Sequence, residues 1–165
     1  HWSTPGVFVP VVTAMFARVN PGVELRQFQG GGMTSSRALS RFLADVVAWK
    51  PQQVLLVVMN RTEADVDAFG EIGRRFSGAG ARVFTFDDVG DPEGSSPELR
   101  ERELAVARET GMTVVEVSRL LAAAPERERF PCLDRIHMTE PYHRLMAKEW
   151  LKMLVGAREA KLAGR

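Results

Sequence analysis

Four short segments of the chain carry hydrophobic patterns that are typical of β-strands. Residues 23–28 alternate between apolar and polar side chains, and residues 53–59 form a continuous apolar run that suits a strand buried on both faces. Residues 81–87 and 112–117 are rich in β-branched and aromatic residues, which favour extended structure. The pattern therefore predicts a strand in each of these four segments.

Between these segments the apolar residues recur with the period of an α-helix. Helices are predicted over residues 6–19, 36–49, 63–77 and 97–110, and a last helix begins near Thr139, which is a suitable N-cap. The last helix has an apolar face on which His143 is expected to be a polar helix residue. That apolar face consists of Leu145, Met146, Trp150, Leu151 and Leu154.

Strand–helix alternation predicts a parallel sheet whose right-handed crossovers place helices on both faces. We therefore expect an α/β fold with three layers, α/β/α, formed by residues 1–165 as a single domain. Parallel sheets of this kind bind their ligands beyond the carboxyl ends of the strands. The residues that follow each strand are therefore the first place to look for chemistry.

Composition excludes several classes of function. The 22 basic and 21 acidic residues are nearly balanced and form no Lys/Arg-rich run, so neither nucleic acid nor a polybasic membrane surface is expected as a partner. The longest apolar run, Val54 to Met59, is too short to span a bilayer. The single Cys132 excludes an intrachain disulfide, and no signal peptide is recognised, so a cytoplasmic location is the default expectation.

Polar residues and glycines follow the predicted strands. "QGGGMTSSRALSR" (29–41) is either a tight strand-to-helix turn or a loop that approaches a ligand, with Ser35 or Ser36 capping the next helix. Asn60 either caps the next segment or donates a hydrogen bond into a cleft. Asp87 and Asp88 have no accompanying cluster of His or carboxylate residues, so they are interpreted as polar loop residues and no metal site is predicted.

Asp134 and His137 lie three residues apart, just before the last predicted helix. A histidine can act as a general base, and a nearby aspartate can fix its tautomer and stabilise the imidazolium. The alternative for this pair taken alone is a surface aspartate and a histidine that caps the helix.

The order of these parts resembles the SGNH (GDSL-type) esterase family over essentially the whole chain. In particular, "LDRIHMTEPYHRLMAKEWLKML" (133–154) is similar to the family's final motif block. The resemblance implies a flavodoxin-like sheet of order 2-1-3-4-5 and a serine esterase that needs no metal or organic cofactor. It implies that Asp134 and His137 are the acid and base of the triad. It also implies that the Gly32 backbone N–H and the Asn60 side chain are the oxyanion donors.

Two blocks of the family pattern differ in this chain. The pattern Gly-x-Asn-Asp reads Val58-Met59-Asn60-Arg61, and no Gly-Asp-Ser block, which would carry the nucleophile, occurs in the sequence. The opening "HWSTPGVFVPVV" resembles the segment that follows the nucleophile, so the first strand and the nucleophile are expected upstream of residue 1. Ser3 stands near the right place but follows Trp2 instead of aspartate.

The leading hypothesis from the sequence is a serine esterase that hydrolyses small acyl esters, such as an O-acetyl group on a sugar. One alternative is an O-acyltransferase on the same scaffold, in which a sugar hydroxyl replaces water. The other is a non-catalytic binding domain that has lost its nucleophile. A strand ending in Gly-Asp-Ser upstream of residue 1 would favour an enzyme over the binding domain.

Overall fold

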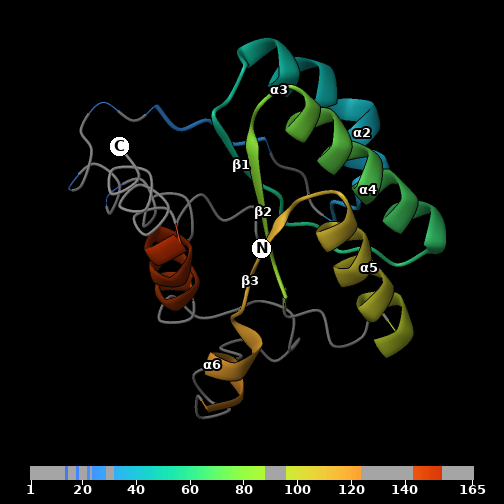
Figure 1. The fold of residues 1–165 in the computed structure, drawn as a ribbon, viewed down its shortest axis with the longest axis vertical. Coiled ribbons are helices and arrows are strands. Elements are labelled where there is room, and N and C mark those ends of the chain that lie inside the picture. The colour runs from blue at the N-terminus through green and yellow to red at the C-terminus, as the bar shows by residue number, and fades with distance from the viewer. Residues whose placement is uncertain are drawn as a thin grey trace. The chain divides into compact units, whose positions relative to one another are not determined.

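Figure 1 shows the fold of the chain, which divides into two compact units. One unit spans Gly30–Glu116, and the other combines His1–Gln29 with Val117–Arg165. The computed structural model describes residues 14, 18, 22, 24–28, 32–87, 96–123 and 143–153. The expectation of a single domain over residues 1–165 stays a prediction.

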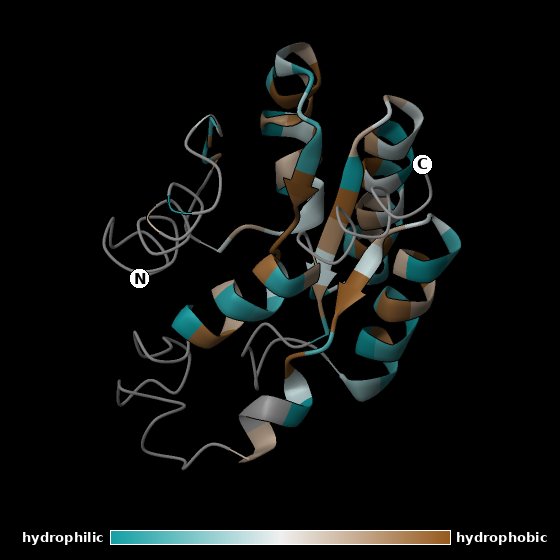
Figure 2. Ribbon diagram, turned by 60° about the vertical axis from the view of Figure 1, so that its left-hand side comes forward, coloured by the Kyte–Doolittle hydropathy of each residue, from teal (hydrophilic) through white to brown (hydrophobic). Residues whose placement is uncertain are grey.

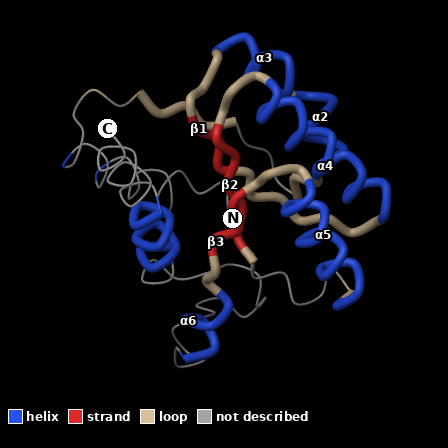
Figure 3. The backbone as a smooth tube through the Cα atoms, viewed as in Figure 1, coloured by secondary structure: helices blue, strands red, loops and turns tan. Residues whose placement is uncertain are grey.

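A three-stranded parallel sheet forms the centre of the Gly30–Glu116 unit (Figure 3). The strands are β1 (Gln53–Leu55), β2 (Arg82–Phe86) and β3 (Thr113–Val115), in the order β1-β2-β3. Val54 lies opposite Val83, and Phe84 lies opposite Thr113. The prediction of an α/β fold with a parallel sheet is therefore confirmed.

Five helices carry labels in Figure 1: α2 (Ser35–Arg41), α3 (Leu43–Trp49), α4 (Glu63–Gly78), α5 (Pro97–Glu109) and α6 (Ser118–Ala123). Helix α4 connects β1 to β2, and α5 connects β2 to β3, so right-handed crossovers put both helices on one face of the sheet. Helix α4 also packs against α2, and Figure 1 shows α2, α4 and α5 side by side.

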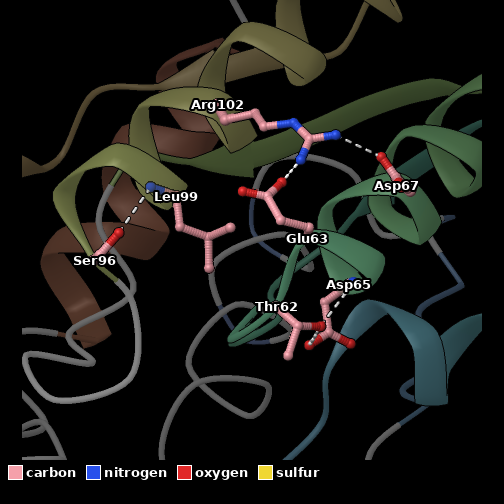
Figure 4. Close-up of polar contacts among 7 residues, drawn as sticks. All are labelled: Thr62, Glu63, Asp65, Asp67, Ser96, Leu99 and Arg102. Atoms are coloured by element: carbon pink, nitrogen blue, oxygen red, sulfur yellow. Dashed lines mark hydrogen bonds and ion pairs between the residues drawn. The ribbon is translucent and has the colours of Figure 1, made fainter.

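Helices α4 and α5 were predicted almost to the residue because their ends carry clear signals. Thr62 and Ser96 are the N-caps, and each side chain accepts a hydrogen bond from a backbone N–H in the first turn (Figure 4). Pro97 occupies the first turn of α5, where its missing N–H costs nothing. Both N-cap residues are in the extended conformation that such caps require.

The core of this unit lies between α4 and the sheet. Phe69, Ile72 and Phe76 on α4 are buried together with Leu56 and Val83. Figure 2 shows hydrophobic residues on all three strands, whereas each helix of the unit carries both hydrophilic and hydrophobic residues. This is the distribution expected when one face of each helix covers a sheet.

Two glycines on α4 allow a close approach to α5 and the turn after it. A Cβ atom on Gly73 would lie 2.2 Å from Met112 Cε and 2.9 Å from Thr110 Oγ1. A Cβ atom on Gly70 would lie 2.8 Å from a methyl group of Val106. Real Cβ atoms do not lie this close to other heavy atoms. Glycine at both positions therefore allows α4 to pack this closely against α5 and the turn that follows it.

Two predictions about the elements before β1 are wrong. Residues 24–28 carry no strand. Alternation indicates only which face of a strand each side chain would take, whereas a strand also needs a hydrogen-bonded neighbouring strand. The helix predicted over residues 36–49 is two helices, because Phe42 leaves the helical conformation at φ −124° and ψ −17°. The apolar spacing runs through Phe42 unchanged, so the sequence gives no sign of this break.

The strand predicted over residues 53–59 is shorter than expected. Strand β1 ends at Leu55, although the ladder extends one residue further, through a hydrogen bond of 2.8 Å from the Leu56 N–H to the Phe84 carbonyl. Likewise the strand predicted over residues 112–117 is limited to Thr113–Val115. Strand ends are poorly marked in an apolar run, because the run continues into buried loop residues such as Val58.

The last predicted helix is present over residues 143–153. Met146, Trp150 and Leu151 are buried as predicted. His143 lies in this helix, as expected, and is buried, because its spacing from Met146 and Trp150 puts it on the same helix face.

Parts of the predicted end helices lie outside the described residues. Thr139 and Leu154 are among them, and only residues 14 and 18 of the helix predicted over 6–19 are described, both of them helical. None of the helices in the part of the chain that the structure describes is long and apolar enough to cross a membrane.

Candidate functional site

Asn60 lies beyond the carboxyl end of β1, where the side chain is 1% exposed. Its Oδ1 atom accepts a hydrogen bond of 3.0 Å from the backbone N–H of Ser35. Because the amide oxygen is fixed by this bond, the NH2 group of Asn60 must face away from Ser35. Asn60 does not cap helix α4, since Thr62 is the N-cap.

The Gly32 turn lies beside Asn60. The Met33 carbonyl accepts a hydrogen bond of 3.0 Å from the Met59 N–H, so residues adjacent to Gly32 and Asn60 are bonded to each other. Gly32 has φ +59°, in the left-handed region that favours glycine, and its carbonyl accepts a hydrogen bond from Arg37 at 3.2 Å. The structure thus brings two of the predicted site residues, Gly32 and Asn60, into neighbouring loops at one edge of the sheet.

The start of α2 differs from the prediction that Ser35 or Ser36 caps it. The N-cap is Thr34, whose backbone is extended and whose side chain accepts a hydrogen bond from the Arg37 N–H. Ser35 is the first helical residue and is completely buried, and the Ser36 hydroxyl donates to the Ala64 carbonyl at 3.4 Å. An N-cap must lie just before the first helical residue, and the helix begins at Ser35.

Asp65 joins the N-termini of α2 and α4. Its carboxylate accepts hydrogen bonds from the Thr62 hydroxyl at 2.9 Å and the Arg61 N–H at 3.2 Å. Figure 4 shows the Thr62–Asp65 pair at the first turn of α4. Burial opposes ionisation, but hydrogen bonds from Ser36, Thr34, Arg61 and Thr62 outweigh it and lower the pKa of Asp65 from 3.8 to about 2. An ionised Asp65 therefore holds the loop that follows Asn60.

A second buried carboxylate, Glu103 on α5, lies near the same edge of the sheet and is 2% exposed. The Arg100 guanidinium donates a hydrogen bond of 2.6 Å to the Oε1 atom of Glu103. It also donates to the carbonyls of Phe86 at 2.5 Å and Asp87 at 3.1 Å. Burial raises the pKa of Glu103. The charge and hydrogen bond of Arg100 oppose that rise.

This arrangement can present hydrogen-bond donors from fixed positions. A backbone N–H in a constrained glycine turn and a side-chain amide held by its oxygen need little reorganisation when a negative charge develops between them. The carboxyl edge of a parallel sheet is also where such folds place their ligands.

The predicted acid and base, Asp134 and His137, lie outside the described residues, and so does Ser3. The same holds for Asp88 and Cys132, for which no role in a site was predicted. Among the described residues, no group of three His, Cys, Asp or Glu side chains could hold a metal ion. Asp87 continues β2, because its N–H donates to the Val115 carbonyl at 3.1 Å.

The sequence reasoning missed Asp65 and Glu103. Asp65 had a detectable signal, because Thr62 and Asp65 have the spacing of a reciprocal cap at a helix start. Glu103 had none, because "PELRERELAVARE" is rich in charges and is typical of a solvent-exposed helix.

The chain matches no family model, and no curated protein matches it. Solved structures do share its fold. An α/β hydrolase enzyme from the metagenome of Lake Arreo, Spain, aligns with a TM-score of 0.68 at 17% identity, over 88% of this chain and 80% of that one. A catalytic mutant of an acetylxylan esterase from Geobacillus stearothermophilus aligns with a TM-score of 0.67 at 14% identity, over 88% and 80%.

A lipase/acylhydrolase from Enterococcus faecalis aligns with a TM-score of 0.65 at 19% identity, over 92% of this chain and 86% of that one. At these identities the likeness concerns the fold. The chain therefore shares the α/β fold of these hydrolases, and an α/β fold is what its sequence predicts.

Proposed function

We propose that this chain is a serine esterase of the SGNH type that hydrolyses small acyl esters. The observation that carries the proposal is the pairing of the Gly32 turn with Asn60 at the carboxyl edge of β1, in a fold shared with esterases and an acylhydrolase. In this proposal the Gly32 N–H and the Asn60 amide are the oxyanion donors. Asp134 and His137, which match the final motif block of the family, are the acid and base.

The reaction follows from these roles. A serine hydroxyl attacks the ester carbonyl while His137 accepts its proton, and the two donors stabilise the negative charge on the carbonyl oxygen. His137 then protonates the departing alcohol, leaving an acyl-serine. Water, deprotonated by His137, attacks the acyl-serine and releases the acid. Asp134 keeps the imidazole in the tautomer that can accept a proton. The scheme uses no metal or organic cofactor.

We assign the nucleophile to a Gly-Asp-Ser serine on a strand that precedes residue 1. Among the described residues, β1 pairs with β2 alone, and in this proposal the preceding strand pairs with the other edge of β1. Ser35 is disfavoured because its side chain is buried, and Ser36 because its hydroxyl donates to the Ala64 carbonyl. Ser3 remains the alternative within the sequence.

An O-acetyl group on a carbohydrate is the proposed class of substrate. Support comes from one aligned enzyme of Geobacillus stearothermophilus, two mutants of which are described as an acetylxylan esterase and an acetyl-xylooligosaccharide esterase. The near balance of charge on this chain also suits an uncharged substrate better than a polyanion.

The test measures hydrolysis of p-nitrophenyl acetate and of acetylated xylo-oligosaccharides by the full-length protein. We expect turnover of both, and loss of about 10³-fold or more in kcat for His137→Ala and for Asp134→Asn, with circular dichroism unchanged. Lys148→Ala, an exposed change on the last helix, is the matched control and should keep wild-type turnover. A folded His137→Ala variant with wild-type turnover contradicts the proposal.

The same assay separates the alternatives left open by the sequence. Transfer of the acetyl group to an added sugar in preference to water would identify an O-acyltransferase. Binding of acetylated oligosaccharide without any turnover would identify a binding domain.

A further inference from the structure

Arg37 occupies a position of helix α2 at which helix stability favours a glutamate. Thr34 is the N-cap, and Arg37 follows it by three residues. A glutamate at this position would complete a capping box by bonding the backbone N–H of the N-cap residue, and negative charge is favourable in the first turn of a helix. Arginine brings the opposite charge, and the first turn of α2 contains no acidic residue. The stability of α2 therefore does not explain an arginine here.

The side chain of Arg37 reaches back from α2 to the turn that precedes the helix. Its Nη1 atom donates a hydrogen bond of 3.2 Å to the Gly32 carbonyl. The same nitrogen is 3.8 Å from the position that a Cβ atom on Gly32 would occupy. Two measurements thus place the guanidinium against Gly32. Both residues are exposed, so the contact lies at the surface of the unit.

The Gly32 turn is held at two consecutive carbonyls. Arg37 bonds the carbonyl of Gly32, and the Met59 N–H bonds the carbonyl of Met33 at 3.0 Å. The direction of the Gly32 N–H relative to these fixed peptides depends on φ of Gly32, which is +59°. Glycine adopts positive and negative φ about equally readily, so the residue itself does not fix this angle. Contacts such as the Arg37 hydrogen bond must fix it instead.

We propose that Arg37 is a positioning residue that holds the Gly32 turn in the conformation in which the Gly32 N–H serves the developing oxyanion. This inference rests on the proposed function, because it takes the Gly32 N–H as an oxyanion donor. It adds a role for a side chain of α2, which the SGNH resemblance of this sequence does not assign.

The sign of the charge on residue 37 agrees with this role. A cation near the Gly32 turn stabilises negative charge that develops there, whereas a carboxylate would repel it. A glutamate at residue 37 would therefore favour the helix and disfavour the reaction, and arginine does the reverse. Loss of stability in exchange for activity is a recurrent property of functional sites.

The test compares Arg37→Ala and Arg37→Glu with Arg41→Glu in the full-length protein. Arg41 is the matched control, because it is exposed on the same helix but its guanidinium lies 5.1 Å from the centre of the Phe42 ring. Three quantities are measured: kcat and KM on p-nitrophenyl acetate, stability by urea denaturation, and the backbone amide resonance of Gly32 by nitrogen–proton NMR.

We expect Arg37→Ala to lower kcat about tenfold with KM unchanged, because a misplaced donor should cost less than the roughly 10²–10³ lost with a whole donor. Arg37→Glu should lower kcat further, although its urea midpoint should lie at or above that of Arg37→Ala. The Gly32 amide resonance should shift in both Arg37 variants. Arg41→Glu should change neither kcat nor this resonance.

Four results would overturn the inference. They are an unmoved Gly32 resonance in both Arg37 variants, an unchanged kcat in Arg37→Ala, an effect on KM alone, and an equal loss of kcat in Arg41→Glu, which would indicate a general effect of charge. A kcat that rises with stability from Arg37→Ala to Arg37→Glu would also contradict it, because Arg37 would then act only through the helix.

Failure of the proposed function looks different from failure of this inference. The wild-type protein would then show no turnover of any ester, whereas failure of the inference leaves wild-type turnover in place. Without wild-type turnover, a shifted Gly32 resonance would still establish the contact with Arg37 but would refute its role in a reaction.

Discussion

Replacing Asp65 by asparagine should destabilise the protein in a way that depends on pH. The side chain is 6% exposed, and hydrogen bonds from the starts of α2 and α4 lower its pKa from 3.8 to about 2. A difference of almost two pKa units between the unfolded and folded states corresponds to about 2 kcal/mol of stability. Asparagine removes the charge that those donors stabilise, so Asp65→Asn should lose about this amount at pH 7.

The sign of the pH effect follows from the lowered pKa of Asp65. A group whose pKa is depressed on folding contributes its full stability above its unfolded pKa, here 3.8, and loses it as the pH falls towards about 2. Roughly half of the contribution should be gone by pH 3. Wild type and Asp65→Asn should therefore differ in stability by about half as much at pH 3 as at pH 7.

Urea denaturation followed by circular dichroism at both pH values measures this difference. Asp45→Asn is the matched control, because Asp45 is also an acidic residue in the first turn of a helix but is exposed. Its change should cost less than about 1 kcal/mol. Two results would refute this role of the ionised Asp65 carboxylate. In the first, the stability difference between wild type and Asp65→Asn is the same at pH 7 and pH 3. In the second, Asp65→Asn loses no more stability at pH 7 than Asp45→Asn does.

Three further predictions follow from other contacts. Gly73→Ala should destabilise the protein by about 1–3 kcal/mol in thermal melts because its Cβ would clash with Met112 and Thr110, whereas Gly78→Ala, with open space around it, should not. Asn60→Ala should lower kcat on p-nitrophenyl acetate by roughly 10²–10³ while the protein stays folded, and an unchanged kcat would leave Asn60 a structural residue only. Arg102→Ala should cost no more than about 1 kcal/mol in urea denaturation, because its ion pairs with Glu63 and Asp67 (Figure 4) are exposed.

The sequence predicts well those parts of the fold that depend on local signals. Helices α4 and α5 begin at Thr62 and Ser96 caps, and the glycines and short polar residues at their ends are visible in the sequence. Phe42 shows the limit of this approach. It interrupts a helix whose apolar spacing is continuous, and the break is decided by the backbone conformation of one residue.

The candidate site likewise has features that the local sequence predicts and features that it does not. Gly32 and Asn60 stand out because they follow predicted strands, and parallel strands end at a common edge. The bond from the Ser35 N–H to Asn60 and the burial of Glu103 arise from packing between segments distant in sequence. No local pattern encodes such contacts, so the burial of a glutamate on a charge-rich helix was not predicted.

The departure from the family pattern after Asn60 can be understood from these contacts. The pattern Gly-x-Asn-Asp places a carboxylate directly after the asparagine, whereas this chain has Arg61 there. The Arg61 N–H donates to the carboxylate of Asp65, and Asp65 also bonds the Thr62 hydroxyl. A carboxylate from the first turn of α4 thus holds the loop just after Asn60, and the Met59–Met33 bond holds it just before. Asn60 is therefore fixed on both sides although its neighbours differ from the family pattern, and so the substitution at Arg61 is compatible with an oxyanion donor at Asn60.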